Sequence, residues 1–212
     1  MERYDKNSIK LPKKLYDQIE NDVVNLYLEL ELTVPIDPKE IATRLGYVVR
    51  KMSDIKEIDR QKMLRFDKEG NRRDGYSYYD PFISTFVIWV NDLDTLSFEH
   101  DDFTIMHEIG HIRLGHKEES DLANRIANYY AAYALVPSPL YALLRCKNAT
   151  DIINTFGVSD KCAENCYPRC INWMQYNGFR KQFEIRLRTY YENVLAEKKK
   201  ITRKEAIPMD TL

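Results

Sequence analysis

Two histidines four residues apart, with a glutamate directly after the first, form the most informative pattern of this 212-residue chain. They are His107, Glu108 and His111, within FTIMHEIGHIRLGH at residues 103–116. On a helix, such histidines share one face about 5–6 Å apart, so both imidazoles can bind one Zn²⁺. Glu108 borders that face, where it can take a proton from a metal-bound water and pass it to a leaving amine. The pattern predicts a zinc-dependent hydrolase.

A third ligand does not follow from the histidines alone. The metzincin arrangement needs a glycine three and a histidine six residues after the second histidine, whereas Gly115 and His116 lie at plus four and plus five. We expect His116 to cap the C-terminus of the helix, where a cation is favoured. For His100 we expect a position in a loop.

The elements that must position these residues follow from apolar spacing and from capping residues. Helices are predicted at about 15–30, 38–45, from Asp101 or Asp102 to Gly115, at 120–135, as a helix–glycine–helix pair over 151–166, and at 179–200. Strands are predicted at 47–52, 76–80 and 85–91, in a mostly antiparallel sheet, with the charged segment 53–74 as a surface loop. The fold class is α+β, mostly helical with a small three-stranded sheet.

Composition excludes several classes of protein. The formal net charge is −1, which gives no bulk attraction to nucleic acid or to an anionic membrane. No apolar stretch is long enough to span a bilayer, and the polar N-terminus has no signal-peptide core. Four cysteines in such a chain indicate reduced thiols, so we expect a cytoplasmic protein.

Two further patterns have simpler explanations. Cys162, Cys166 and Cys170 are spaced four apart along one expected helix, whereas zinc ribbons use cysteine pairs joined through loops with a fourth ligand. Pro168 is also expected to interrupt this helix. We interpret these residues as buried thiols. The helix pair over residues 150–176 has the outline of a DNA-reading motif but offers few basic side chains, so direct nucleic-acid binding is not expected.

The sequence around the histidines resembles the ImmA/IrrE family of metallo-endopeptidases. The resemblance rests on VNDLDTLSFEHDDFTIMHEIGHIRLGH and the following SDLANRIANYYAAYALVPSPL, with similar segments from residue 11 to about residue 175. It implies a zincin-like fold, Zn²⁺ as cofactor, and hydrolysis of a peptide bond in a regulatory protein. In that family the target is typically a helix-turn-helix repressor.

The chain departs from the family pattern at one ligand. The second helix of the family carries a glutamate, and the matching position here is Asn124. Its amide oxygen is neutral and a weaker zinc ligand than a carboxylate. Three explanations stay open: Asn124 ligates weakly, Asp121 one turn earlier substitutes (with Glu118 or Glu119 as outside options), or the site is catalytically silent.

These readings lead to a set of expectations about the whole protein. Residues 1–145 are predicted to form the metallopeptidase domain, and residues 146–212 a helical, helix-turn-helix-like extension and tail. Substrate is expected along the TFVIWVN strand (85–91). Tyr129 or Tyr130 is a candidate oxyanion donor, but packing in the core is the favoured interpretation of both. The alternative function is a catalytically silent module that binds and controls a regulator.

Overall fold

The structure is a computed structural model that describes residues 11–66, 70, 72–93, 98–118, 120–176 and 178–205, with the backbone only at 98–99 and 201–205. The elements in chain order are α1 (Lys13–Glu29), α2 (Pro38–Arg44), β1 (Val48–Lys51), the 3₁₀ turn η1 (Met52–Asp54), α3 (Glu57–Met63), β2 (Gly75–Asp80), β3 (Thr85–Val90), α4 (Phe98–Arg113), α5 (Asp121–Leu135), α6 (Ser138–Leu143), α7 (Ala149–Phe156), α8 (Asp160–Tyr176) and α9 (Gln182–Glu205). This confirms the prediction of a mostly helical α+β protein with one small sheet.

The sheet is mixed rather than mostly antiparallel. The order is β1-β3-β2, with β1 parallel and β2 antiparallel to β3. The expectation of a mostly antiparallel sheet was therefore wrong for β1, because the long connection through α3 and β2 lets β1 and β3 run in the same direction. β3 is the central strand, and its residues from Val87 to Val90 are buried. The sheet edge in contact with α4 (Phe98–Arg113) is β2. TFVIWV is the central strand, so the expectation that it offers a free edge to an extended peptide was wrong.

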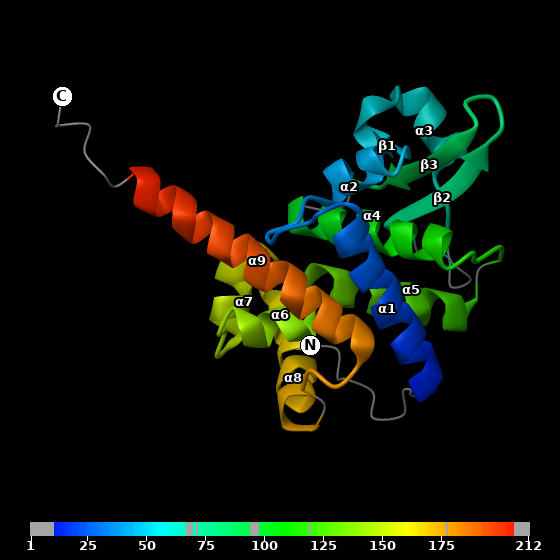
Figure 1. Ribbon diagram of the computed structural model, residues 1–212. Coiled ribbons are helices and arrows are strands. Elements are labelled where there is room, and N and C mark those ends of the chain that lie inside the picture. Colours follow the sequence, from blue (N-terminus) through cyan, green and yellow to red (C-terminus); the bar gives the residue numbers. More distant parts are fainter. Residues whose placement is uncertain are drawn as a thin grey trace, which may run out of the picture.

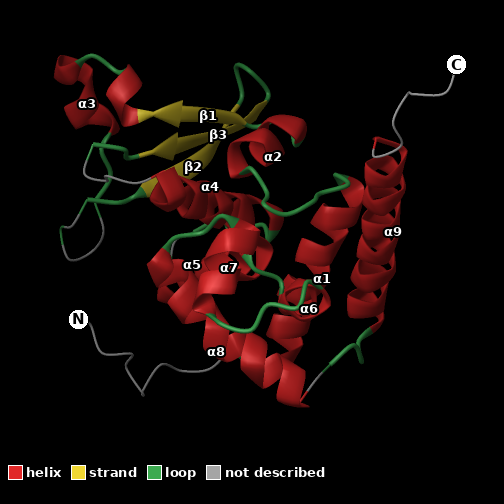
Figure 2. Ribbon diagram, turned by 90° about the vertical axis from the view of Figure 1, so that its left-hand side faces the viewer, coloured by secondary structure: helices red, strands yellow, loops and turns green. Residues whose placement is uncertain are grey.

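The helix that carries HExxH lies directly beneath the sheet, and α5 lies beneath that helix (Figures 1 and 2). α4 begins at Phe98, earlier than predicted, so neither Asp101 nor Asp102 is its N-cap. Asp101 is instead buried against β1, where its carboxylate binds the Lys51 ammonium at 2.6 Å. Asp101, predicted as a helix cap, thus forms an ion pair from within the first turn of α4.

Gly110 lets α4 and α5 approach closely. A Cβ atom at this position would lie 3.0 Å from three carbon atoms of Tyr130 on α5, closer than real Cβ atoms normally come. α5 begins as predicted, with the Ser120 side chain accepting a hydrogen bond from the Ala123 amide at 3.1 Å. The close approach places the polar face of α5 beside the histidines of α4.

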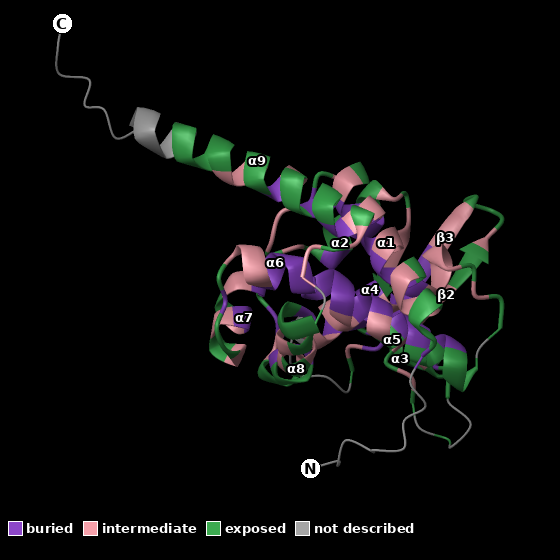
Figure 3. Cartoon of the chain, turned by 60° about the horizontal axis from the view of Figure 1, so that its bottom comes forward, coloured by how far each residue is buried: buried purple, intermediate pink, exposed green. Residues whose placement is uncertain are grey.

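The remaining helices complete one hydrophobic core beneath α5. α1 lies beside α9, and α8 packs against α6 and α7 (Figure 1). Contrary to the expectation, α8 continues through Pro168, because Cys166, Cys170 and Trp173 are buried on both sides of the proline and hold the helix in place. The three cysteines are free thiols, and Cys166 and Cys170 are buried as predicted. Between residues 192 and 200, α9 is mostly exposed (Figure 3).

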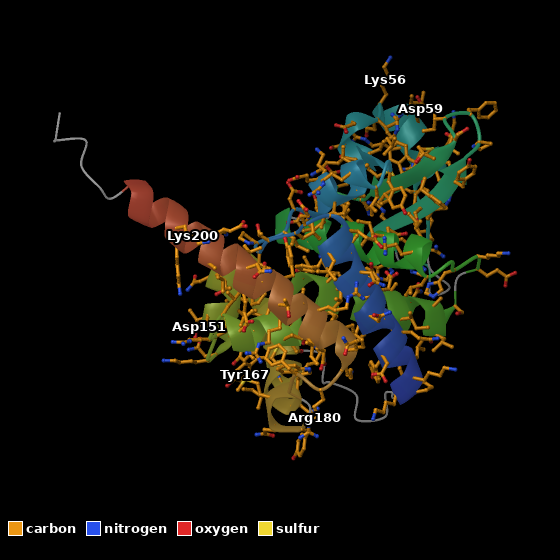
Figure 4. The ribbon with its side chains drawn as sticks, in the orientation of Figure 1. Lys56, Asp59, Asp151, Tyr167, Arg180 and Lys200 are labelled. Atoms are coloured by element: carbon orange, nitrogen blue, oxygen red, sulfur yellow. The ribbon has the colours of Figure 1, made fainter. Side chains whose placement is uncertain are left out.

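The segment expected to be a loop at 53–74 contains a short helix. α3 has no buried residue, and its charged side chains face outward, as Asp59 does in Figure 4 together with Lys56 directly before the helix. Apolar burial, the main signal for a helix, is therefore missing from its sequence. Within the described ranges, no helix is both long and apolar enough to cross a lipid bilayer.

Candidate active site

One cavity of about 350 Å³ gathers the predicted catalytic residues. It opens where the start of β2, the middle of α4 and the first turns of α5 meet. Its lining from the motif consists of His107, Glu108 and His111. The other lining residues are Arg72, Arg73, Asp74, Gly75, Ser77, Phe103, Thr104, His116, Lys117, Glu118, Asn124 and Asn128.

The two motif histidines point their Nε2 atoms at each other across one turn of α4. The distance between the Nε2 atoms of His107 and His111 is 3.0 Å. Ligands bound at about 2.0–2.1 Å to one tetrahedral ion lie only a few tenths of an ångström farther apart than this. Burial lowers the pKa of His107, and burial together with the neighbouring imidazoles lowers the pKa of His111 to about 4. Both rings are therefore neutral at pH 7, which is the state that binds a metal.

The outer nitrogen of each motif histidine also has a partner. Nδ1 of His107 lies 2.8 Å from Oδ1 of Asn128 on α5, and Nδ1 of His111 lies 3.0 Å from Nδ1 of His116. Metal-binding histidines in proteins are commonly oriented by such a bond on the nitrogen that does not ligate. The contacts therefore orient both rings with Nε2 toward the cavity.

His116 was expected to cap the C-terminus of α4 through its side chain, and this expectation was wrong. The cap is made by backbone: Gly115, with φ +68°, donates to the Ile112 carbonyl, and the His116 amide donates to the His111 carbonyl. This is the Schellman arrangement, which turns the chain back over the last helical turn. The imidazole of His116 consequently lies against His111, with ring centroids 4.9 Å apart.

Glu108 is buried beside the histidines and is held by β2. The hydroxyl of Ser77 donates to Oε2 of Glu108 at 2.7 Å. Burial raises the pKa of Glu108 to about 7, while the Ser77 hydrogen bond and the charge of Arg73 act in the opposite direction. A carboxyl group with a pKa near neutrality can both accept and donate a proton at pH 7. Glu108 thus has the environment of a general acid/base.

The lining of the cavity distinguishes between the candidates for the third ligand. Asn124 lines the cavity, and the interaction of its side chain with His111 acts to raise the pKa of that ring, against the larger effect of burial. Asp121 is exposed in the first turn of α5 and does not line the cavity. Glu118 lines the cavity from the loop before α5, while Glu119 lies outside the described residues. Of the two α5 candidates for the third ligand, Asn124 and Asp121, the one that lines the cavity is therefore Asn124, which matches the family glutamate.

The donor set fits a divalent metal ion, although loosely. Among the side chains that the structure describes, no group of three or more His, Cys, Asp or Glu residues is arranged to hold a metal. His107 and His111 supply two converging imidazole nitrogens, and Asn124 supplies a neutral amide. These residues would hold Zn²⁺ or a similar ion with two strong donors and one weak one.

Two other candidates lie away from the chemistry. The hydroxyl of Tyr129 donates to Glu20, and that of Tyr130 donates to Asp22, both on α1. Neither tyrosine lines the cavity, so the suggested oxyanion role was wrong. His100 is helical rather than in a loop, and its Nε2 lies 3.4 Å from an oxygen of Asp74.

Sequence reasoning gave no role to Ser77 or Asn128. Ser77 and Glu108 are 31 residues apart in the chain, so no local spacing in the sequence predicts their contact. Asn128 belongs to the quoted pattern on α5, and the one signal available was its position four residues after Asn124, on the same helix face. Gly75 was missed as well: a Cβ there would lie 2.5 Å from Thr104 and 2.8 Å from the Trp89 carbonyl.

A helix with HExxH under a small mixed sheet, with its histidines and glutamate in one cavity, defines a zincin-like metallopeptidase domain. The sequence model described as the IrrE N-terminal-like domain, of peptidase family M78, matches residues 42–164, more than half of the chain. The chain therefore belongs to the ImmA/IrrE family of metallopeptidases. A search among curated proteins finds none that matches it.

Proposed function

We propose that the protein is a zinc-dependent endopeptidase that cleaves one regulatory protein, a helix-turn-helix repressor being the target that the family resemblance favours. The observation that carries the proposal is the grouping in one cavity of two converging Nε2 atoms and a buried glutamate held by Ser77. Two histidine ligands and a general acid/base need only a third metal ligand to complete a hydrolytic metal site.

Each residue has a defined part in the proposed reaction. His107, His111 and Asn124 would hold Zn²⁺, which would supply Lewis-acid chemistry at the peptide carbonyl. Glu108 accepts a proton from the attacking water and returns it to the amine of the departing peptide. Ser77 keeps one oxygen of that carboxylate in place by donating a hydrogen bond from its hydroxyl group. Asn128 accepts from Nδ1 of His107 and fixes that imidazole with Nε2 facing the cavity.

The substrate chain is proposed to lie along β2. This strand is at an edge of the sheet, and Gly75 and Ser77 at its start line the cavity. An extended peptide could add to this edge through backbone hydrogen bonds, which recognise chain direction rather than sequence. The scissile bond would then pass Glu108 at the point where Ser77 contacts it.

A catalytically silent module that binds and controls a regulator is the second proposal. It is favoured by one observation, the neutral Asn124 at the position where the family carries a glutamate. A carboxylate would add charge and affinity that an amide does not supply. The two proposals share a fold and a partner and differ in whether the metal is held.

The deciding measurement is the metal content of protein purified without chelator. About one Zn²⁺ per chain, lost in His111→Ala, is expected for the endopeptidase, and the loss in Asn124→Ala compared with Asp121→Ala identifies the third ligand. Cleavage is then assayed against a candidate repressor, with Glu108→Gln as the inactive form. Absence of bound zinc after incubation with excess ion would exclude the endopeptidase and leave the silent module.

A further inference from the structure

Three imidazoles and one amide form a continuous line through the site. Oδ1 of Asn128 meets Nδ1 of His107 at 2.8 Å. Nε2 of His107 meets Nε2 of His111 at 3.0 Å. Nδ1 of His111 meets Nδ1 of His116, also at 3.0 Å. The line therefore joins α5 to the loop after α4 through both rings of the motif.

Donor and acceptor rules fix every proton along this line. An amide oxygen only accepts, so Nδ1 of His107 carries the proton of that ring. A neutral imidazole has a single N–H, so Nε2 of His107 must accept from Nε2 of His111. Nδ1 of His111 must in turn accept from Nδ1 of His116. In the metal-free chain, His116 is thus the first donor of the line.

We propose that His116 is a positioning residue that serves His111 in both the metal-free and the metal-bound protein, an inference that rests on the proposed function. A nitrogen that binds a metal carries no proton, so His111 must hold its proton at Nδ1 once Nε2 ligates. The contact between His111 and His116 then reverses. His111 donates from Nδ1, and His116 accepts at Nδ1 and carries its own proton at Nε2. Each ring stays neutral, because one proton changes position on each.

The backbone explains why this position suits a histidine. The turn at Gly115 places the His116 side chain back over the last turn of α4, against His111. A side chain that only donates, such as lysine, would match one state of His111, and a carboxylate would match only the other. An imidazole can do both without moving.

The first test is the proton position on each ring, read from long-range ¹H–¹⁵N NMR spectra of ¹⁵N-labelled full-length protein at pH 8. In the metal-free protein we expect the proton at Nδ1 in His107 and His116 and at Nε2 in His111. With one equivalent of Zn²⁺, His111 should change to Nδ1–H and His116 to Nε2–H, while His107 keeps its state. A His116 ring whose proton does not move on zinc binding would overturn the proposal.

The second test is the affinity for Zn²⁺, measured by competition with a chromophoric chelator. Loss of a partner to a ligand histidine typically weakens metal binding about 10–100-fold, so we expect this for His116→Ala. His116→Asn should restore most of the affinity, because an amide can present either a donor or an acceptor at that place. Lys161→Ala is the control: this side chain is exposed on α8 and does not line the cavity, so its loss should leave the affinity unchanged.

Other results separate this inference from the proposed function. Equal affinities of the wild type and His116→Ala would overturn the inference alone. Complete loss of binding in His116→Ala, with an altered absorption spectrum of the Co²⁺-substituted protein, would make His116 a direct ligand and equally overturn it. A wild-type chain that binds no Zn²⁺ would refute the proposed function itself, and with it the metal-dependent reversal.

Discussion

Glu108 shows how one residue receives its character from several elements. Its helix places it beside the histidines, burial raises its pKa to about 7, and a serine on the neighbouring strand holds one of its oxygens. Burial alone would favour the neutral acid, whereas the Ser77 hydroxyl favours the carboxylate. The balance leaves a group that can exchange a proton in either direction near neutral pH.

Replacing Glu108 tests its chemical role directly. Glu108→Gln keeps the shape of the side chain but cannot accept a proton, so cleavage should fall by about 10²–10⁴-fold. The fold and the bound metal should remain, since Glu108 is not a ligand. The checks are turnover of a cleavable protein, metal content and the circular dichroism spectrum. Glu57→Gln, an exposed glutamate on α3, serves as control, and equal activity of both variants would contradict the assignment.

The effect of the Ser77 hydroxyl on turnover can be measured separately from that of Glu108. A hydrogen bond to a charged group contributes about 1.5–3 kcal/mol, so its loss in Ser77→Ala should slow turnover roughly 10–100-fold. Ser77→Thr retains a hydroxyl at the same place and should keep most of the rate. Turnover at saturating substrate distinguishes the two variants. Equal loss in Ser77→Ala and Ser77→Thr would show that packing at β2, rather than the hydrogen bond, is what matters.

At the scale of elements, α4 is fixed at both ends. Lys51 of β1 binds Asp101 in its first turn, and Arg113 in its last turn binds Asp22 of α1 through two contacts of 2.7 and 3.1 Å. Tyr130 of α5 donates to the same aspartate. The helix that carries the histidines is therefore tied to the sheet, to α1 and to α5, which keeps its face toward the cavity.

Breaking the Arg113–Asp22 pair should destabilise the fold. Asp22→Asn leaves a mostly buried guanidinium with only its 3.5 Å contact to the exposed Glu29, which should lower the free energy of unfolding by about 2–3 kcal/mol. Arg44→Ala is the control, because its pair with Glu40 is exposed and 3.8 Å long and should contribute less than about 0.5 kcal/mol. Urea titration of both variants measures the difference. Similar stabilities would show that the pair at the end of α4 contributes little.

The contact between α4 and α5 depends on Gly110. In Gly110→Ala, the new methyl group meets Tyr130 and must push the helices apart, at a cost of about 1–3 kcal/mol. His107 would then lie farther from Asn128, so the affinity for Zn²⁺ should also fall. Thermal denaturation and chelator competition report the two effects. An unchanged midpoint and affinity would mean that the helices accommodate a methyl group here.

The elements that sequence predicts best are those whose signals are local. The HExxH spacing, the apolar stripe of α1, the Asp37 cap of α2 and the Gly157 turn between α7 and α8 each depend on a few consecutive residues. Strand order, the bond from Ser77 to Glu108 and the ion pair of Asp101 join distant residues, and no local rule contains them. Asn124 was located through the family resemblance, because spacing alone left several candidates.

At the scale of the whole molecule, the helices of the C-terminal region share the core beneath α5. Buried residues of α8 and α9, such as Cys166, Leu187 and Tyr191, belong to the same cluster as those of α1 and α4. The matched family region, 42–164, ends inside α8. The division at residue 145 stays a prediction, which limited proteolysis can test.

The metal-free protein should lose stability in acid. His111 has a pKa of about 4 in the fold, below its ordinary value of 6.5, so the unfolded chain takes up a proton first as the pH falls. Stability should therefore decline from about pH 6.5 toward pH 4, by roughly 1 kcal/mol for this half-buried ring after allowing for solvent screening. The melting midpoint would fall by about 2–4 °C.

The acid effect can be assigned to His111 by comparison. Carboxylates also titrate in this range, so the measure is the difference in melting midpoint between the wild type and His111→Gln, both stripped with chelator. The difference should shrink as the pH falls from 7 to 4.5. A constant difference would contradict the lowered pKa. Zinc-loaded wild type should melt higher than the stripped form, because a ligand that binds only the folded chain stabilises it.

The order in which the site can assemble during folding follows from its sequence separations. His107 and His111 are one helical turn apart and come together as soon as α4 forms, within the time of helix formation. Ser77 must cross 31 residues to reach Glu108, and that contact waits for β2 to dock on the helix. A chain still emerging from the ribosome can therefore present the paired imidazoles before the glutamate has its serine. On this order, the two imidazoles pair before Glu108 gains the hydrogen bond that holds its carboxylate, so an early folding intermediate would contain the histidine pair without the Ser77 contact.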